Sequence, residues 1–207
     1  HVHPKTKNKT MNKRQFFKTG ILGAAALALS KKMSALEYYP NPSDKKWAVL
    51  YSTWCGSSRD AGVWISEGMD GIANVFDVRE NPDLSAYDHL IIGGSIRMGK
   101  VSEEMQQYIE RNKAQLKDKI RGLFAVCGNR MQPPGEEVTS MLISNHLARI
   151  CGVENLPSKV FLGRITYGLM EEQSRDALKG MGMPEYDNLK RSECMDFGKE
   201  VLAASQK

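Results

Sequence analysis

Residues 51–60 read YSTWCGSSRD and directly follow the apolar run WAVL at residues 47–50. A short apolar run that ends in glycine and hydroxyl residues indicates a buried strand leading into a turn. Such a turn offers hydroxyls and backbone N–H groups, which together suit an anion. A nucleoside-triphosphate loop requires GK followed by Ser or Thr, and this turn contains no lysine. The stretch therefore predicts an anion-binding turn of another kind.

Apolar runs and helical patterns alternate through the rest of the chain. Strands are predicted at 47–51, 73–78, 90–93, 123–126 and 160–162, and helices at 59–69, 102–116, 137–151 and 189–204. Short apolar strands separated by helices indicate parallel strands covered on both faces. The sequence therefore predicts an α/β fold with an open, doubly wound sheet. Its ligand site should lie at the carboxyl ends of the strands.

Two other α/β sites are excluded by the same turn. A dinucleotide site requires GxGxxG after the first strand, where only Gly56 is present. A phosphoacceptor receiver requires acidic residues at the end of that strand, where Tyr51, Ser52 and Thr53 stand instead.

Three loops, in this order, resemble those of the flavodoxin family. The stretch STWCGSS at residues 52–58 resembles the flavodoxin phosphate loop, and it is similar to the longer variant in flavodoxin-like protoporphyrinogen oxidases. YDHLIIGGSIRMGK at 87–100 resembles the second flavin loop of that group, with Met98 in place of an aromatic residue. AVCGNRM at 125–131 falls where flavodoxins place their last flavin loop. The resemblance covers about residues 47–205 and implies a five-stranded parallel sheet in the order 2-1-3-4-5, with helices on both faces.

The resemblance also implies noncovalent FMN as the cofactor and electron transfer as the function, in an oxidoreductase similar to protoporphyrinogen oxidase. The FMN phosphate needs several hydrogen-bond donors, which the first loop and the following helix can supply. No catalytic side chain is assigned. The cofactor-binding residues implied are Ser52, Thr53, Trp54, Cys55, Gly56, Ser57, Ser58, Ser95, Ile96, Arg97, Met98, Gly99, Cys127, Gly128 and Asn129.

Several alternatives stay open. The first loop could merely cap its helix through Ser58, and Arg97 could pair with Glu103 or Glu104 at the surface. The chain could also be a flavodoxin-fold interaction module that has lost FMN, or an FMN-dependent quinone reductase. The partners implied are a redox protein or a small-molecule electron donor or acceptor, such as a quinone or a porphyrinogen. The residues after the fifth strand, including Tyr167, are predicted to form a loop, which could contact such a partner or could use its methionines simply to fill gaps.

The positive charge of the chain is concentrated near its beginning. Residues 1–46 hold ten Lys and Arg against two acidic residues, whereas the rest of the chain has a net charge of −3. A nucleic-acid-binding domain should carry positive charge on its folded surface, so we expect no nucleic-acid partner. Basic residues followed by TGILGAAALALS at 19–30 resemble an export signal, with KRQFFK similar to the twin-arginine pattern. We therefore expect three parts: an export signal or membrane anchor at 1–36, a linker at 37–45 and the flavodoxin-like domain at 46–207.

The four cysteines are widely spaced and form no CxxC pair. This spacing excludes a thioredoxin-type motif and a standard zinc site, so no metal site is expected. Cys55 and Cys127 each follow a strand and should flank the same site. We expect both to be unpaired thiols, because an intervening strand would hold their backbones roughly 10 Å apart.

Overall fold

The computed structural model describes residues 41–128 and 130–206. The predicted N-terminal extension and the first part of the predicted linker lie outside these residues. Within them, no helix is long and apolar enough to cross a membrane.

The centre of the fold is a sheet of five parallel strands. The strands are β1 (Trp47–Ser52), β2 (Ala73–Asp77), β3 (His89–Ser95), β4 (Ile120–Cys127) and β5 (Ser158–Leu162). They are arranged in the order β2-β1-β3-β4-β5, and every pairing is parallel. The predicted fold and strand order are confirmed. The chain crosses from β2 to the far side of β1 to form β3, which places the topological switch point between β1 and β3.

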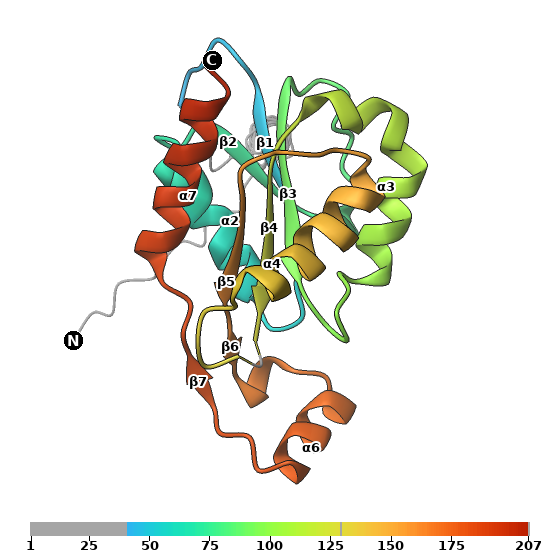
Figure 1. The fold of residues 1–207 in the computed structure, drawn as a ribbon, viewed down its shortest axis with the longest axis vertical. Helices are drawn as coiled ribbons and strands as arrows, with labels where there is room; N and C mark the ends of the chain where they lie inside the picture. Colours follow the sequence, from blue (N-terminus) through green and yellow to red (C-terminus); the bar gives the residue numbers. More distant parts are fainter. Residues whose placement is uncertain (1–40, 129, 207) are drawn as a thin grey trace, which may run out of the picture. The chain divides into compact units, whose positions relative to one another are not determined.

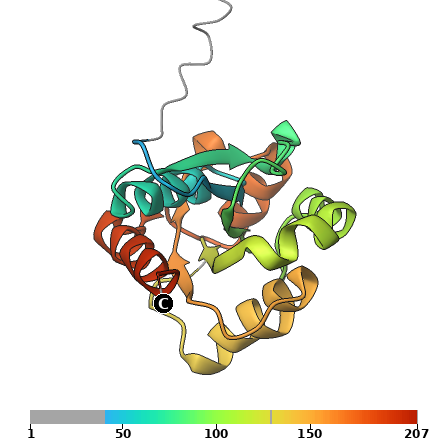
Figure 2. The same ribbon diagram turned by 90° about the horizontal axis from the view of Figure 1, so that it is seen from above.

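Helices cover both faces of the sheet, as the two views show (Figures 1 and 2). One face is covered by α2 (Ser57–Gly68) and α7 (Arg191–Ala204), and the other by α3 (Glu103–Leu116) and α4 (Glu136–Leu142). The helix predicted at 137–151 is not α-helical throughout. After α4 it continues as one turn of π-helix, η3 (Ile143–Ala148), and ends in α5 (Arg149–Cys151). Short 3₁₀ turns complete the body at η1 (Val78–Glu80) and η2 (Lys117–Lys119).

The segment after β5 is not the simple loop that the sequence predicts. It contains β6 (Arg164–Ile165), the 3₁₀ turn η4 (Tyr167–Leu169), helix α6 (Glu172–Gly180) and β7 (Tyr186–Asp187). β6 and β7 pair antiparallel in a small sheet of their own. α6 extends beyond the carboxyl ends of the main strands (Figure 1), and none of its residues is buried. Only Ala177 and Leu178 of its nine residues are apolar, which is too few for the sequence to show a helical apolar stripe.

Two glycines bring α2 and α7 together backbone to backbone. A Cβ atom on Gly198 would lie 2.2 Å from the Ile65 carbonyl oxygen, and one on Gly68 would lie 2.0 Å from that of Met195. No side chain larger than hydrogen fits at either position. This close approach fixes α2, whose first turn faces the ligand end of the sheet.

We predict that Gly198→Ala destabilises the protein by about 1–3 kcal/mol, although alanine is the better helix former. The cause is the clash of the new Cβ with the Ile65 carbonyl. Urea unfolding measures it as a lower midpoint with an unchanged slope. The matched control is Gly180→Ala in α6, where a Cβ meets no atom within 4 Å. That variant should be neutral or slightly stabilising, and equal destabilisation of the two variants would contradict the packing argument.

Candidate functional site

A cavity of about 480 Å³ opens at the carboxyl ends of the strands. The segments that follow β1, β3, β4 and β5 all contribute to its lining, together with α4 and α6. The cavity therefore lies beside the switch point, where open α/β sheets bind their ligands.

The structure brings most of the predicted site residues to this cavity. Ser52 and Ser58 are buried beside it, and Gly56 forms the turn behind it, but these three are not part of its wall. Asn129 lies outside the described residues. The predicted residues that line the wall are Thr53, Trp54, Cys55, Ser57, Ser95, Ile96, Arg97, Met98, Gly99, Cys127 and Gly128.

The first loop turns sharply from β1 into α2. Gly56 adopts a left-handed conformation with φ of 84°, and its N–H donates to the Thr53 hydroxyl at 3.0 Å. Gly56 is also the N-cap of α2, and no side chain caps this helix. The alternative that Ser58 serves as the helix cap is therefore wrong.

Hydrogen-bond donors without acceptors collect around this turn. The hydroxyls of Ser52 and Ser58 are buried and have no partner in the described protein. The first N–H groups of a helix, here from Ser57 onward, have no acceptor within the helix. Buried donors without partners are costly, and an anion seated at the turn would satisfy them. The first loop therefore has the donor set that a phosphate group requires.

Arg164 joins the first loop to the segment after β5. Its guanidinium Nη2 lies 2.7 Å from Asp60 Oδ2 in the first turn of α2, and its Nε lies 3.1 Å from Asp187 Oδ2 without forming a hydrogen bond. Its backbone N–H donates to the Ser57 hydroxyl, and its carbonyl accepts from the Cys55 thiol. The ion pair neutralises Asp60, a negative charge that would otherwise repel an anion at this helix end.

The second loop is a two-residue hairpin turn. The backbones of Arg97 and Lys100 exchange two hydrogen bonds, and Met98 and Gly99 between them have φ of 51° and 78°. These angles fit a type I′ turn, in which methionine is an unusual first residue. The Met98 side chain is 93% exposed at the mouth of the cavity.

Arg97 stacks on an aromatic ring of the first loop. Its Cζ atom lies 4.7 Å from the centre of the Trp54 ring, a cation–π contact that joins the two loops. Within residues 41–128 and 130–206, Arg97 forms no ion pair, so the alternative of pairing with Glu103 or Glu104 is wrong.

The cysteines are all free thiols, as predicted for the pair near the site. Burial raises the pKa of Cys127 to about 11, although the nearby Arg130 charge lowers it. The Cys127 thiol is therefore protonated at neutral pH and is a poor nucleophile. The described residues contain no cluster of three or more side chains that could hold a metal ion.

The far wall of the cavity was not expected from the sequence. This wall contains Arg130 and Arg164, three side chains of α4, and the α6 segment. Arg164 is the second residue after β5, so its place near the strand end could have signalled it. α6 offered no such signal, because it is short and only Ala177 and Leu178 within it are apolar.

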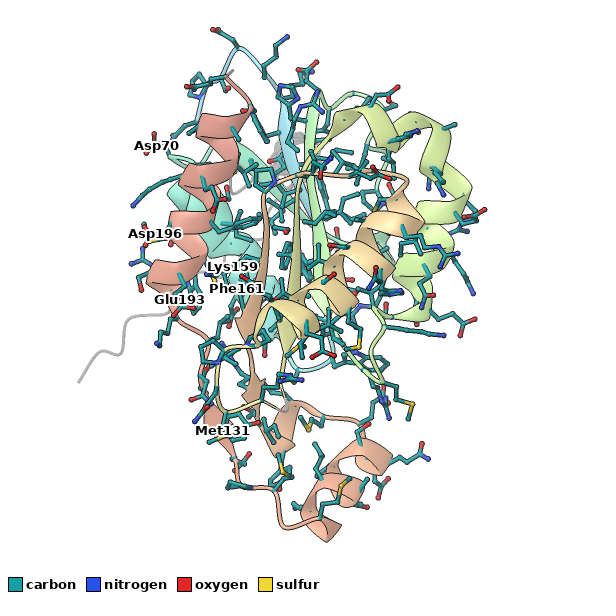
Figure 3. All side chains as sticks on the ribbon, viewed as in Figure 1. Asp70, Met131, Lys159, Phe161, Glu193 and Asp196 are labelled. Atoms are coloured by element: carbon teal, nitrogen blue, oxygen red, sulfur yellow. The ribbon has the colours of Figure 1, made fainter. Side chains whose placement is uncertain are left out.

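Exposed apolar side chains gather at this end of the molecule. The large hydrophobic residues that are exposed in the described chain are Trp54, Met98, Met131, Met141, Leu169 and Met181. Four of them line the cavity, and the other two adjoin lining residues in the sequence. Figure 3 shows Met131 at the junction with the β6–β7 sheet, where its sulfur accepts from the Asn188 amide at 3.7 Å. A patch of this kind marks a binding surface.

The chain matches one protein family by sequence and is similar to several solved structures. The family model described as Flavodoxin domain matches residues 48–184. Among solved structures, a flavodoxin from the domain Archaea has 14% identity and a TM-score of 0.49, covering 78% of this chain and 99% of that one. Flavodoxin 1 from Bacillus cereus has 12% identity and a TM-score of 0.47, covering 76% and 97%.

The Flv1 flavodiiron core from Synechocystis has 15% identity and a TM-score of 0.47. The match covers 77% of this chain but only 36% of that protein, so this chain spans about a third of its length. A comparison with curated proteins gave no match.

His146 supports the second loop from behind. The Val101 N–H donates to His146 Nε2 at 3.0 Å, so this nitrogen must stay unprotonated. Burial, and then the Lys100 charge, lower the pKa of His146 below its ordinary value near 6.5. The unfolded chain therefore binds this proton at a higher pH than the folded protein does. The stability that His146 contributes is complete above about pH 6.5 and is lost as the pH falls through the folded-state pKa.

We predict that His146→Gln, which keeps an acceptor but cannot titrate, makes stability less sensitive to pH between 7 and 5. Urea unfolding at several pH values gives the free energy of unfolding for both proteins, and the wild type should fall more steeply. His89→Gln is the control, because the His89 pKa is also lowered by burial but this residue lies at the opposite end of the strands. The NMR signal of the Val101 backbone amide reports the order of the second loop. This signal should shift between pH 7 and 5 in the wild type and in His89→Gln, but not in His146→Gln.

Proposed function

Because this chain belongs to the flavodoxin domain family, we propose that it binds FMN without a covalent link and transfers electrons through it. One observation carries the proposal. The turn at Gly56 gathers buried, unpartnered hydroxyls and the start of α2 beside the switch point of the sheet. A dianionic phosphate satisfies those donors, whereas a simple helix cap does not require them.

Each loop would have a separate task. Thr53, Ser57 and Ser58 would donate to the phosphate, while Arg164 keeps Asp60 neutralised. Trp54 and Arg97 would flank the ring, and the Arg97 charge would favour negative charge placed beside it. FMN supplies the redox chemistry when bound, and the protein supplies position and electrostatics.

The apolar side chains that α4 and α6 contribute to the far wall support a small-molecule partner for the electron transfer. The resemblance of residues 95–99 to the loop of protoporphyrinogen oxidases supports an oxidoreductase of that type, with a porphyrinogen or a quinone as the partner. A quinone reductase fed by a nicotinamide donor is the second candidate, and the same apolar wall favours it. Export or membrane anchoring through residues 1–36 remains our proposal for location.

The test is an FMN titration of the full chain, followed by desalting and a visible spectrum. We predict that flavin absorption survives desalting in the wild type. Arg164→Gln should weaken FMN binding by about tenfold, because Asp60 then keeps only its ion pair with the exposed Arg59 and places more negative charge near the phosphate.

Two further variants separate charge from damage to the fold. Adding Asp60→Asn to Arg164→Gln should restore much of the affinity, because the repelling charge is gone. Ser144→Ala, an exposed hydroxyl on η3, is the neutral control. A wild-type protein that emerges colourless would overturn the proposed function and leave the interaction module as the reading of this fold.

A further inference from the structure

The wall of the cavity is divided into two chemically different sides. The loops after β1, β3 and β4 bring hydroxyls, glycines and the Trp54–Arg97 stack. The opposite side is formed by two helices, and apart from Ser174 of α6 their lining side chains are apolar: Val138, Met141 and Leu142 of α4, and Ala177, Leu178 and Met181 of α6 or directly after it. We call these six residues the apolar slot.

The α6 side of the slot is an amphipathic face that no core covers. The cavity-lining residues Ser174, Ala177, Leu178 and Met181 are spaced as i, i+3, i+4 and i+7, which places them on one face of the helix. Yet no residue of α6 is buried, and Met181 is 69% exposed. The helix therefore presents its apolar face to the cavity without packing it against the body.

The base of the α6 segment is nevertheless held firmly. The Tyr186 hydroxyl donates to the Gly128 carbonyl at 2.5 Å, and the Tyr167 hydroxyl donates to the Met183 carbonyl. Arg164 adds its ion pair with Asp60. A helix held in place with its apolar face uncovered is suited to a ligand that covers it.

Charge at the edge of the slot selects the kind of ligand. Four charged residues line the cavity, and two of these are already engaged: Arg164 by Asp60, and Arg97 by Trp54. Arg130 forms no ion pair within the described residues, and it lies close enough to Cys127 to lower the pKa of that thiol. Glu171 is the one carboxylate among the lining residues. It stands at the N-cap of α6, and Arg130 is the lining cation that neither an ion pair nor an aromatic ring engages within the described residues.

We propose that the apolar slot is a second binding site, which holds a flat, apolar ring molecule with a negatively charged group while the cofactor occupies the loop side. The ring lies between α4 and α6, and the negative group meets Arg130. Methionine side chains suit this task, because they are flexible and polarisable enough to pack on a flat ring. The inference deepens the proposed function by giving its small-molecule partner a place and a chemistry.

The test uses 2-naphthalenesulfonate as the probe, added to the full chain with and without FMN. Methionine methyl groups labelled with ¹³C report where the probe binds. We expect saturable shifts of the Met141 and Met181 signals, and no shift of Met69 and Met105, which are fully buried in the two cores. Flavin absorption after desalting, measured in parallel, shows whether FMN stays bound.

Matched variants check the site. Leu178→Asp places a charge in the slot and should weaken probe binding by about tenfold. Gln173→Asp adds the same charge to α6 at an exposed position outside the lining and should leave binding unchanged. Both variants should fold normally, because α6 contributes nothing to the core. Arg130→Gln should weaken binding of the sulfonate severalfold and leave binding of the neutral 2-naphthol unchanged.

The outcomes separate this inference from the proposed function. Shifts at Met141 and Met181 with FMN retained support both. The same shifts in a chain that never retains FMN support the slot and contradict the proposed cofactor. Retained FMN without these shifts overturns the slot alone. Release of FMN by the probe, or shifts confined to Met98 and Met131, would also overturn it, because the slot would then be part of the cofactor site or of the outer surface.

Discussion

The site depends on one constraint of the backbone: the chain must leave the fully buried strand β1 and enter α2 within four residues. Gly56 makes this possible by adopting a left-handed conformation that other residues resist. α2 cannot shift to relax the turn, because Gly68 and Gly198 hold it in backbone contact with α7. The unpaired N–H groups at the start of α2 are therefore fixed beside the switch point. A preorganised donor set of this kind binds an anion without the cost of ordering a loop.

Much of the fold follows from the sequence, for reasons that the structure makes plain. Strands such as β1 are buried on both faces, so they read as continuous apolar runs bounded by turns. Ser102 marks the start of α3, where its hydroxyl accepts from the Met105 N–H. α6 escapes the same reasoning because only Ala177 and Leu178 of its nine residues are apolar. The turn of π-helix at η3 is also invisible, because an α-helix and a π-helix share nearly the same apolar spacing over one turn.

In the site, too, features within one loop can be predicted from the sequence, whereas contacts between distant residues cannot. The first loop is a continuous stretch, so its donors can be read directly from STWCGSS. Arg164 lies 104 positions after Asp60, and nothing in either sequence context announces their ion pair. The Trp54–Arg97 stack has the same character, since it joins loops that follow different strands. Side chains that act together within one continuous loop can be recognised from the sequence. Side chains from different loops, which only the strand order brings together, cannot.

The contacts of Arg164 also connect the two sides of the cavity. Its backbone bonds to Ser57 and Cys55 in the first loop, and its guanidinium lies between Asp60 of α2 and Asp187 of β7. Strand β6, which leads into the α6 segment, thus starts at the same residue that contacts the turn at Gly56. A ligand that shifted Arg164 from the turn would therefore also act on the segment that leads to α6. If binding on one side changes the affinity of the other side in this way, thermodynamic reciprocity requires the effect to have the same size in both directions.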